Sequence, residues 1–143
     1  MRDHKNTGRS HKWEKYEKLI VKPFDWEDRD LVFHSKQGMS ELGPLISFLN
    51  QKMVEGADLN VFVHHIEVKG ETGPDYVEVH THDVSQAYVF PEPGLTFEVT
   101  LGDEKYRAES PATVFIPAGL KHNLKILKGK GIEVCILRKG YYG

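Results

Sequence analysis

The chain has 143 residues and a formal net charge of −2, with 19 Lys and Arg against 21 Asp and Glu. This length is typical of one domain, and 39% hydrophobic residues exclude a disordered chain. The balanced charge argues against nucleic-acid binding, and no apolar run approaches the roughly 20 residues of a membrane-spanning helix. The single Cys135 permits no disulfide within the chain, and the charged N-terminus lacks an apolar signal-peptide core, so we expect a cytoplasmic protein.

Residues 1–22 are predicted to form a charged N-terminal arm, in which Lys and Arg predominate and apolar residues are sparse before Trp13. Four apolar or aromatic residues of the arm fall at helical spacing: Trp13, Tyr16, Leu19 and Ile20. We expect this short stretch to pack onto the body of the domain or onto a second subunit.

Residues 23–59 are predicted to hold a strand and one short helix. Leu31, Val32 and Phe33 suit a short strand. Pro44 fits the first turn of a helix that ends near Gly56. The one-sided apolar stripe of this helix consists of Leu45, Ile46, Phe48, Leu49 and Met53.

From Asn60 onward, short β-branched or aromatic runs alternate with turn residues. The runs cover residues 60–68, 75–82, 86–90, 95–101, 105–109, 113–116, 122–127 and 132–137. Residues 95–101 alternate apolar and polar side chains, and Gly102-Asp103 suits a two-residue hairpin turn. Residues 129–131, Gly-Lys-Gly, suit a second tight hairpin. The pattern predicts an all-β sandwich or barrel over residues 60–143.

Histidines are grouped in a way that suits a metal site. His80 and His82 lie two residues apart on a predicted strand, so their side chains point to the same side of the sheet. Gln86 follows at the same even parity, and His122 begins another strand after Pro117-Ala118-Gly119. Any one of these histidines alone would more often be a hydrogen-bonded structural residue. Together, three imidazoles and one amide oxygen suit Zn, Ni, Mn or Fe(II), with open positions for water or substrate.

These spacings resemble the two sequence motifs of the cupin superfamily. The first motif is approximated, with one extra residue in two of its gaps, by Gly73, His80, His82, Gln86 and Gly94. The centre of the second motif is matched by Pro117, Gly119 and His122. The resemblance implies a single jelly-roll β-barrel with one divalent metal held by His80, His82, the residue at position 86, and His122. It also implies a homodimer, because small single-domain cupins often dimerise.

Three positions depart from the cupin pattern. Gln86 replaces the usual acidic ligand, whereas Pro111 and Ile126 replace a Gly and an Asn of the second motif, where we expect only turns to change. A neutral amide leaves a bound dication with one more positive charge than a carboxylate would, which favours Lewis-acid over redox chemistry. Some cupins have Gln at this position, including ones that resemble uronate ring-opening proteins and polyketide cyclases. The resemblance to these cupins implies the same non-redox chemistry.

Further residues are candidates for the site by their parity. Glu78 should face the same cavity as His80 and His82, where it is a candidate general acid or base. Tyr88 and Phe90 continue this parity and are candidates for the substrate pocket. The remaining candidates are expected to be structural or surface residues outside the site: His4, His11, His34, His64, His65 and Cys135.

The sequence supports three functions. The first is a metal-dependent enzyme that acts on a small polar organic substrate by an isomerase, lyase or hydration-type reaction. The second is an Fe(II)-dependent cupin dioxygenase with the same ligands. The third is a non-catalytic module that binds a small molecule. In all three the partner is a small molecule, with neither nucleic acid nor membrane involved.

Overall fold

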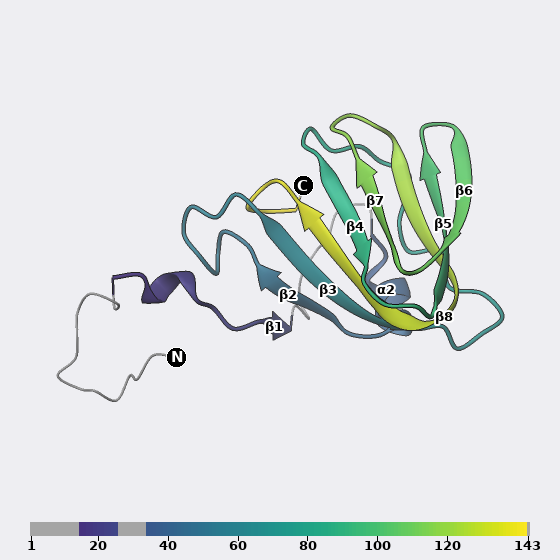
Figure 1. Ribbon diagram of the computed structural model, residues 1–143, viewed down its shortest axis with the longest axis horizontal. Helices are drawn as coiled ribbons and strands as arrows, with labels where there is room; N and C mark the ends of the chain where they lie inside the picture. Colours follow the sequence, from purple (N-terminus) through teal and green to yellow (C-terminus); the bar gives the residue numbers. More distant parts are fainter. Residues whose placement is uncertain (1–14, 26–33, 143) are drawn as a thin grey trace.

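The computed structural model describes residues 15–25 and 34–142, and within them the chain is mostly β (Figure 1). The described residues form eight strands, one α-helix and one short 3-10 helix. The strands are β1 (Phe24–Asp25), β2 (Leu45–Leu49), β3 (Asn60–Glu67), β4 (Gln86–Phe90), β5 (Leu95–Leu101), β6 (Glu104–Glu109), β7 (Ala112–Ile116) and β8 (His122–Leu137). The prediction of an all-β fold is confirmed, and the strand predicted at residues 31–33 lies outside the described residues.

The strands form two antiparallel layers that share one long strand. One layer has the order β1-β2-β3-β8-β4-β7, and in the other β5 lies between β6 and the first part of β8. Gly102-Asp103 joins β5 to β6, as the hairpin prediction required, with Leu101 opposite Glu104. Strands β1 and β2 therefore belong to the same sheet as the strands after Asn60.

Strand β8 corrects one prediction. Residues 129–131 lie inside this continuous strand and do not form a hairpin between two strands. Gly129 pairs with Leu95 of β5, whereas Lys130 pairs with Glu67 of β3, so the strand passes from one layer to the other at this point. Gly129 has φ +103°, which an L side chain rarely adopts. Gly129 and Gly131 mark a bend within a strand. For that reason the sequence Gly-Lys-Gly resembles a turn.

The helix prediction is wrong in position. Helix α2 covers Lys36–Leu42, with the Ser35 hydroxyl accepting a bond from the Gly38 amide at its start, and Gly43 at its end. Pro44 thus follows a helix C-terminus and does not begin a helix. The apolar residues after it form strand β2, which pairs with β3 and buries Leu45 and Ser47.

The described residues of the N-terminal arm are mostly exposed, unlike those of the sheets. Its 3-10 helix η1 (Glu17–Leu19) buries no residue, and it lies apart from both layers in Figure 1, in purple. Tyr16, Leu19 and Ile20 are each more than half exposed. These described residues do not pack on the body of the domain, Trp13 lies outside the described residues, and contact with a second subunit stays a prediction. No helix among the described residues is long and apolar enough to span a membrane.

The hydrophobic core lies between the two layers. Phe90 of β4 and Phe97 of β5 stack with ring centroids 4.1 Å apart, and both are almost fully buried. Such stacking joins the layers by large apolar contacts. Phe90, a candidate for the substrate pocket, is therefore a core residue. The buried polar side chains of His80, His82, Gln86 and His122 lie instead at the end of the molecule at which β4 and β8 begin.

Candidate metal centre

The three histidines of the predicted site come together at the start of β8. His80 and His82 lie in the connection between β3 and β4, which is not the regular strand predicted for residues 75–82. Backbone hydrogen bonds of 3.1 and 2.9 Å join His80 and His122 in an isolated antiparallel bridge. The Gly119 amide donates to the His82 carbonyl at 2.8 Å, so the turn before His122 holds the same connection.

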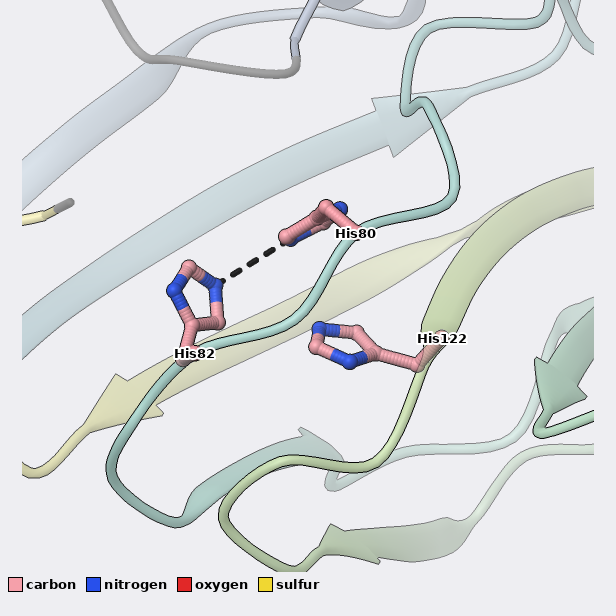
Figure 2. Close-up of side chains that lie close together, drawn as sticks. All are labelled: His80, His82 and His122. Carbon is pink, nitrogen blue, oxygen red and sulfur yellow. Dashed lines mark hydrogen bonds between the residues drawn. The ribbon is translucent and has the colours of Figure 1, made fainter.

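The three rings approach one another closely, as Figure 2 shows. One ring nitrogen from each of His80, His82 and His122 lies within 4.8 Å of the other two. The Nε2 atoms of His80 and His82 are 3.1 Å apart. This is the convergence that the sequence spacing predicted, although a bridged loop and not a strand produces it.

The backbone fixes which nitrogen of two rings can bind a metal. His80 Nδ1 lies 2.6 Å from the Glu78 carbonyl, and His122 Nδ1 lies 2.9 Å from the Leu120 carbonyl. A carbonyl only accepts, so both Nδ1 atoms carry the proton and both Nε2 atoms keep a lone pair. Metal-bound histidines are oriented by this kind of second hydrogen bond.

Burial disfavours the charged form of two of these rings. His80, His82 and His122 are 5%, 4% and 0% exposed. Loss of water lowers the pKa of His80 and of His122, outweighing the backbone hydrogen bonds that raise it. His122 Nε2 is also buried without a hydrogen-bond partner among the described residues. Buried imidazoles whose Nδ1 protons are held by backbone carbonyls, as in His80 and His122, fit a divalent transition metal.

The other predicted ligand, Gln86, begins β4 and is buried. Its amide nitrogen donates to Cys135 Sγ at 3.2 Å, and its amide oxygen is buried without a hydrogen-bond partner in the described part of the chain. The oxygen is therefore free to accept from a ligand. Whether it binds the metal stays a prediction.

Glu78 is exposed, although its backbone carbonyl orients His80. The prediction that Glu78 faces the same cavity as His80 required a regular strand through residues 75–82. The described chain has only single bridges there, at Val77 and His80. Tyr88 is buried, its ring centroid lies 6.3 Å from that of His122, and its hydroxyl has no partner among the described residues. Of these two candidates, Tyr88 faces the interior near the histidines.

A small cavity of about 30 Å³ lies in the interior, and its lining reaches the three histidines through Tyr142, which contacts His82. This volume suffices for about one water molecule. Its lining combines apolar residues with seven groups capable of proton transfer or hydrogen bonding: His34, His64, Tyr76, Tyr88, Glu133, Cys135 and Tyr142.

Sequence reasoning missed Glu133. It lies in β8 opposite His64, is 5% exposed, and burial raises the pKa of its carboxyl to about 8. A signal was present, because Glu133 shares strand parity with Cys135 and Leu137 and so occupies an inward position between apolar neighbours. A carboxyl group at such a position is uncommon unless it has a function.

His34 and Tyr142 were also missed. The His34 ring centroid lies 5.7 Å from that of His80 and 5.2 Å from that of Tyr142, so the prediction that His34 stays outside the site is wrong. The Tyr142 hydroxyl lies 3.2 Å from His82 Nε2. Both residues come from segments distant in sequence, so no local pattern announced them.

The remaining predictions agree with the structure where residues are described. His64 Nε2 lies 3.1 Å from the carbonyls of Met39 and Gly43, a structural role, and His65 is exposed. Burial raises the pKa of the Cys135 thiol, which disfavours a nucleophilic thiolate. His4 and His11 lie outside the described residues.

No family model matches the chain, and no curated protein matches it. Solved structures do resemble it. An RmlC-like cupin from Shewanella frigidimarina is 18% identical over 59% of this chain and 68% of that one, with a TM-score of 0.44. The Cnp3 cupin domain of Schizosaccharomyces pombe is 13% identical over 67% and 64%, with a TM-score of 0.50.

Oxalate decarboxylase from Bacillus subtilis, in a structure concerned with its Mn(II) centres, is 14% identical over 87% of this chain, with a TM-score of 0.53. The match spans 31% of that enzyme. At these identities the likeness concerns the fold. The chain has the all-β cupin fold that its motifs predicted, with three histidines that can hold a metal ion.

Proposed function

We propose that the protein binds one divalent transition metal through His80, His82 and His122 and is an enzyme for a small polar organic molecule. One observation carries this proposal. Three buried imidazoles converge, and in two of them a backbone carbonyl holds the Nδ1 proton and so orients Nε2. A structural role for the histidines does not explain why the His122 Nε2 atom is buried without a partner among the described residues.

The donor set favours Lewis-acid chemistry. A bound dication supplies a Lewis acid that polarises an oxygen of the substrate. Three neutral imidazoles and the neutral amide of Gln86 do not reduce the charge of the ion as a carboxylate would. We therefore favour an isomerase, lyase or hydration-type reaction of a carbonyl or hydroxy-acid compound.

The polar interior supports a small polar substrate. Buried atoms without a described partner include the Gln86 amide oxygen, the Tyr88 hydroxyl and both polar side-chain atoms of Asn60. Asn60 and Gln86 both pair with Leu137, so they occupy the same row across the sheet. Unpaired buried polar groups are costly, and a hydrogen-bonding ligand would satisfy them.

Glu133 is the group that we assign to proton transfer. It lines the same cavity as Tyr88, and its pKa of about 8 allows both the protonated and the charged form near neutral pH. In the charged form it would accept a proton from the substrate, and in the protonated form it would return one. Glu78, the candidate predicted from the sequence, is exposed and lies in the connection between β3 and β4.

Turnover assays with carboxyl-to-amide variants test this assignment. Protein loaded with Zn, Ni or Mn is assayed against a panel of small carbonyl and hydroxy-acid compounds. We expect Glu133→Gln to reduce kcat by roughly 100-fold or more, within the range for general acid-base groups, with metal content unchanged. Glu67→Gln, an exposed change on β3, is the matched control. Loss of turnover in Glu78→Gln with full turnover in Glu133→Gln would reverse the assignment.

The iron enzyme is the second candidate, because three histidines are also a suitable set for Fe(II). Oxygen uptake by the iron-loaded protein with a panel of catechols, thiols and diketones tests it. Uptake that depends on substrate would replace the Lewis-acid proposal. Metal binding without turnover in either panel would favour the non-catalytic binding module.

A further inference from the structure

The segment after β8 is held firmly beside the histidines. The Arg138 amide donates to the Ser85 carbonyl at 3.2 Å, and Lys139 Nζ lies 2.5 Å from Asp83 Oδ1. The Gly140 carbonyl accepts from the Gln51 amide at 2.7 Å. These contacts attach residues 138–140 to the β3–β4 and β2–β3 connections. Tyr142, two residues further along the chain, lies next to the histidines as a result.

Tyr142 is oriented by aromatic neighbours. Its ring meets the rings of His34 and His82 edge to face, with centroids 5.2 and 4.9 Å apart, and lies 6.1 Å from Phe62. Edge-to-face contacts of this kind are favourable and stabilise the observed orientation of the ring. In that orientation the hydroxyl points at the imidazole nitrogens.

The hydroxyl lies where a ligand would lie. Tyr142 Oη is 3.2 Å from His82 Nε2 and 3.4 Å from His80 Nε2, and those two nitrogens are 3.1 Å apart. In a tetrahedral site with bonds of about 2.0–2.1 Å, ligand atoms are separated by about 3.3 Å. The three measured separations agree with the edges of one face of such a tetrahedron.

The site also lacks an anionic ligand elsewhere in the described chain. The clustered metal-ligating groups there are three histidines, without a carboxylate. The neutral Gln86 occupies the position at which the cupin motif has an acid, and its amide nitrogen is bonded to Cys135. Tyr142 is thus the group near these nitrogens that can offer an anionic oxygen.

We propose that Tyr142 Oη is a fourth ligand of the metal, bound as a phenolate. The O–H bond breaks, the phenol proton passes to solvent, and the oxygen electron pair binds the ion, as happens when other protonated ligands bind metals. This inference rests on the proposed metal binding. It places a C-terminal residue in the metal centre and lowers the charge of the site by one unit relative to the neutral donors alone. A zinc-like ion with one anionic ligand would still act as a Lewis acid and would accept substrate by adding a fifth ligand.

Visible absorption of iron-loaded protein tests the ligand directly. A phenolate bound to Fe(III) gives a visible charge-transfer band that imidazole ligands alone do not give. Wild-type, Tyr142→Phe and Tyr141→Phe proteins are loaded with Fe(II), oxidised in air and analysed for iron content. Tyr141 is an exposed neighbour and provides the matched control. We expect the band in wild-type and Tyr141→Phe proteins and its loss in Tyr142→Phe.

Zinc affinity provides a second readout, measured by competition with a chelator. We expect Tyr142→Phe to weaken zinc binding by at least about tenfold, the lower end of the loss when a partner of a metal site is removed. Bound iron without the band in wild type, a band that persists in Tyr142→Phe, or unchanged zinc affinity would overturn the inference and leave the histidine site intact. A wild-type protein that binds neither ion would overturn both this inference and the proposed function.

Discussion

The two ends of the molecule carry hollows of opposite kinds. Where β3 and β4 end, an open hollow of about 630 Å³ is lined by residues that include His65, Glu67, Lys69 and Lys130. Where β4 and β8 begin, the ring nitrogens of three buried histidines converge, and the interior cavity near them, which these three histidines do not line, measures only about 30 Å³. Charges at the wide hollow are mixed in sign, and exposed charges are screened by water and salt. Convergent buried donor atoms, and not volume, identify the site.

The largest effect that we expect concerns the bend in β8 at the wide end. A Cβ atom at Gly129 would lie 1.9 Å from the Gly94 carbonyl oxygen, and φ is +103°. Gly129→Ala should cost about 3 kcal/mol or more of unfolding free energy, from overlap with backbone and the unfavourable φ. Gly119→Ala, near the histidines, has positive φ but nothing within 4 Å, and should cost about 1 kcal/mol. Urea unfolding of both variants measures this, and equal losses would contradict the tight crossing between layers.

The second effect is the pH dependence of stability caused by Glu133. Burial raises its folded pKa to about 8, above the ordinary value of 4.5, so the folded state binds the extra proton. Stability from this group is complete below about pH 4.5 and falls as the pH rises to about 8. In the metal-free protein the neighbouring Tyr76, Tyr88 and Tyr142 stay uncharged, because burial raises their pKa values as well.

Glu133→Gln should therefore remove this decline and stabilise the protein by a few kcal/mol at pH 8 and above. Urea unfolding between pH 5 and about 9 measures the change, with Glu67→Gln at the wide end as the control. If Glu133→Gln leaves the pH profile of the wild type unchanged, the carboxyl is not buried as described.

A smaller effect is expected at Tyr88. Its hydroxyl is buried without a partner among the described residues, and such a group destabilises the folded state. Tyr88→Phe should raise the unfolding free energy by about 1 kcal/mol while it lowers turnover, because the hydroxyl is kept for the ligand. Thermal unfolding and the turnover assay together test this. A loss of stability would show that the hydroxyl has a structural partner.

Local spacing was sufficient to predict the three histidines and most strands. The HxH pair and the Pro-x-Gly turn before His122 are short-range patterns, and burial alternates along β3, β4 and β7. Sheet pairing decided the rest. Residues 45–49 suited one face of a helix as well as a strand, and pairing with β3 selects the strand. Gly129 resembled a turn because a bend between layers needs the same backbone freedom.

The missed site residues depend on contacts that the sequence does not encode locally. Tyr142 contacts His82, which lies 60 positions away along the chain. The rings of His34 and Tyr142 also meet, although the two residues are even further apart in the sequence. Glu133 was different, because an acid at an inward position of an apolar strand was visible in the sequence. A search for charged residues at inward strand positions would have found it.

The most direct test of the account is the metal content of protein purified without an affinity tag. Elemental analysis compares wild type with His80→Ala and His122→Ala, and with His65→Ala, which changes an exposed histidine at the wide end. We expect about one equivalent of a transition metal in wild type and in His65→Ala. We expect His80→Ala and His122→Ala to lose this metal. No metal in wild type after reloading with Zn, Ni, Mn and Fe(II), or metal retained in His80→Ala and His122→Ala, would contradict it.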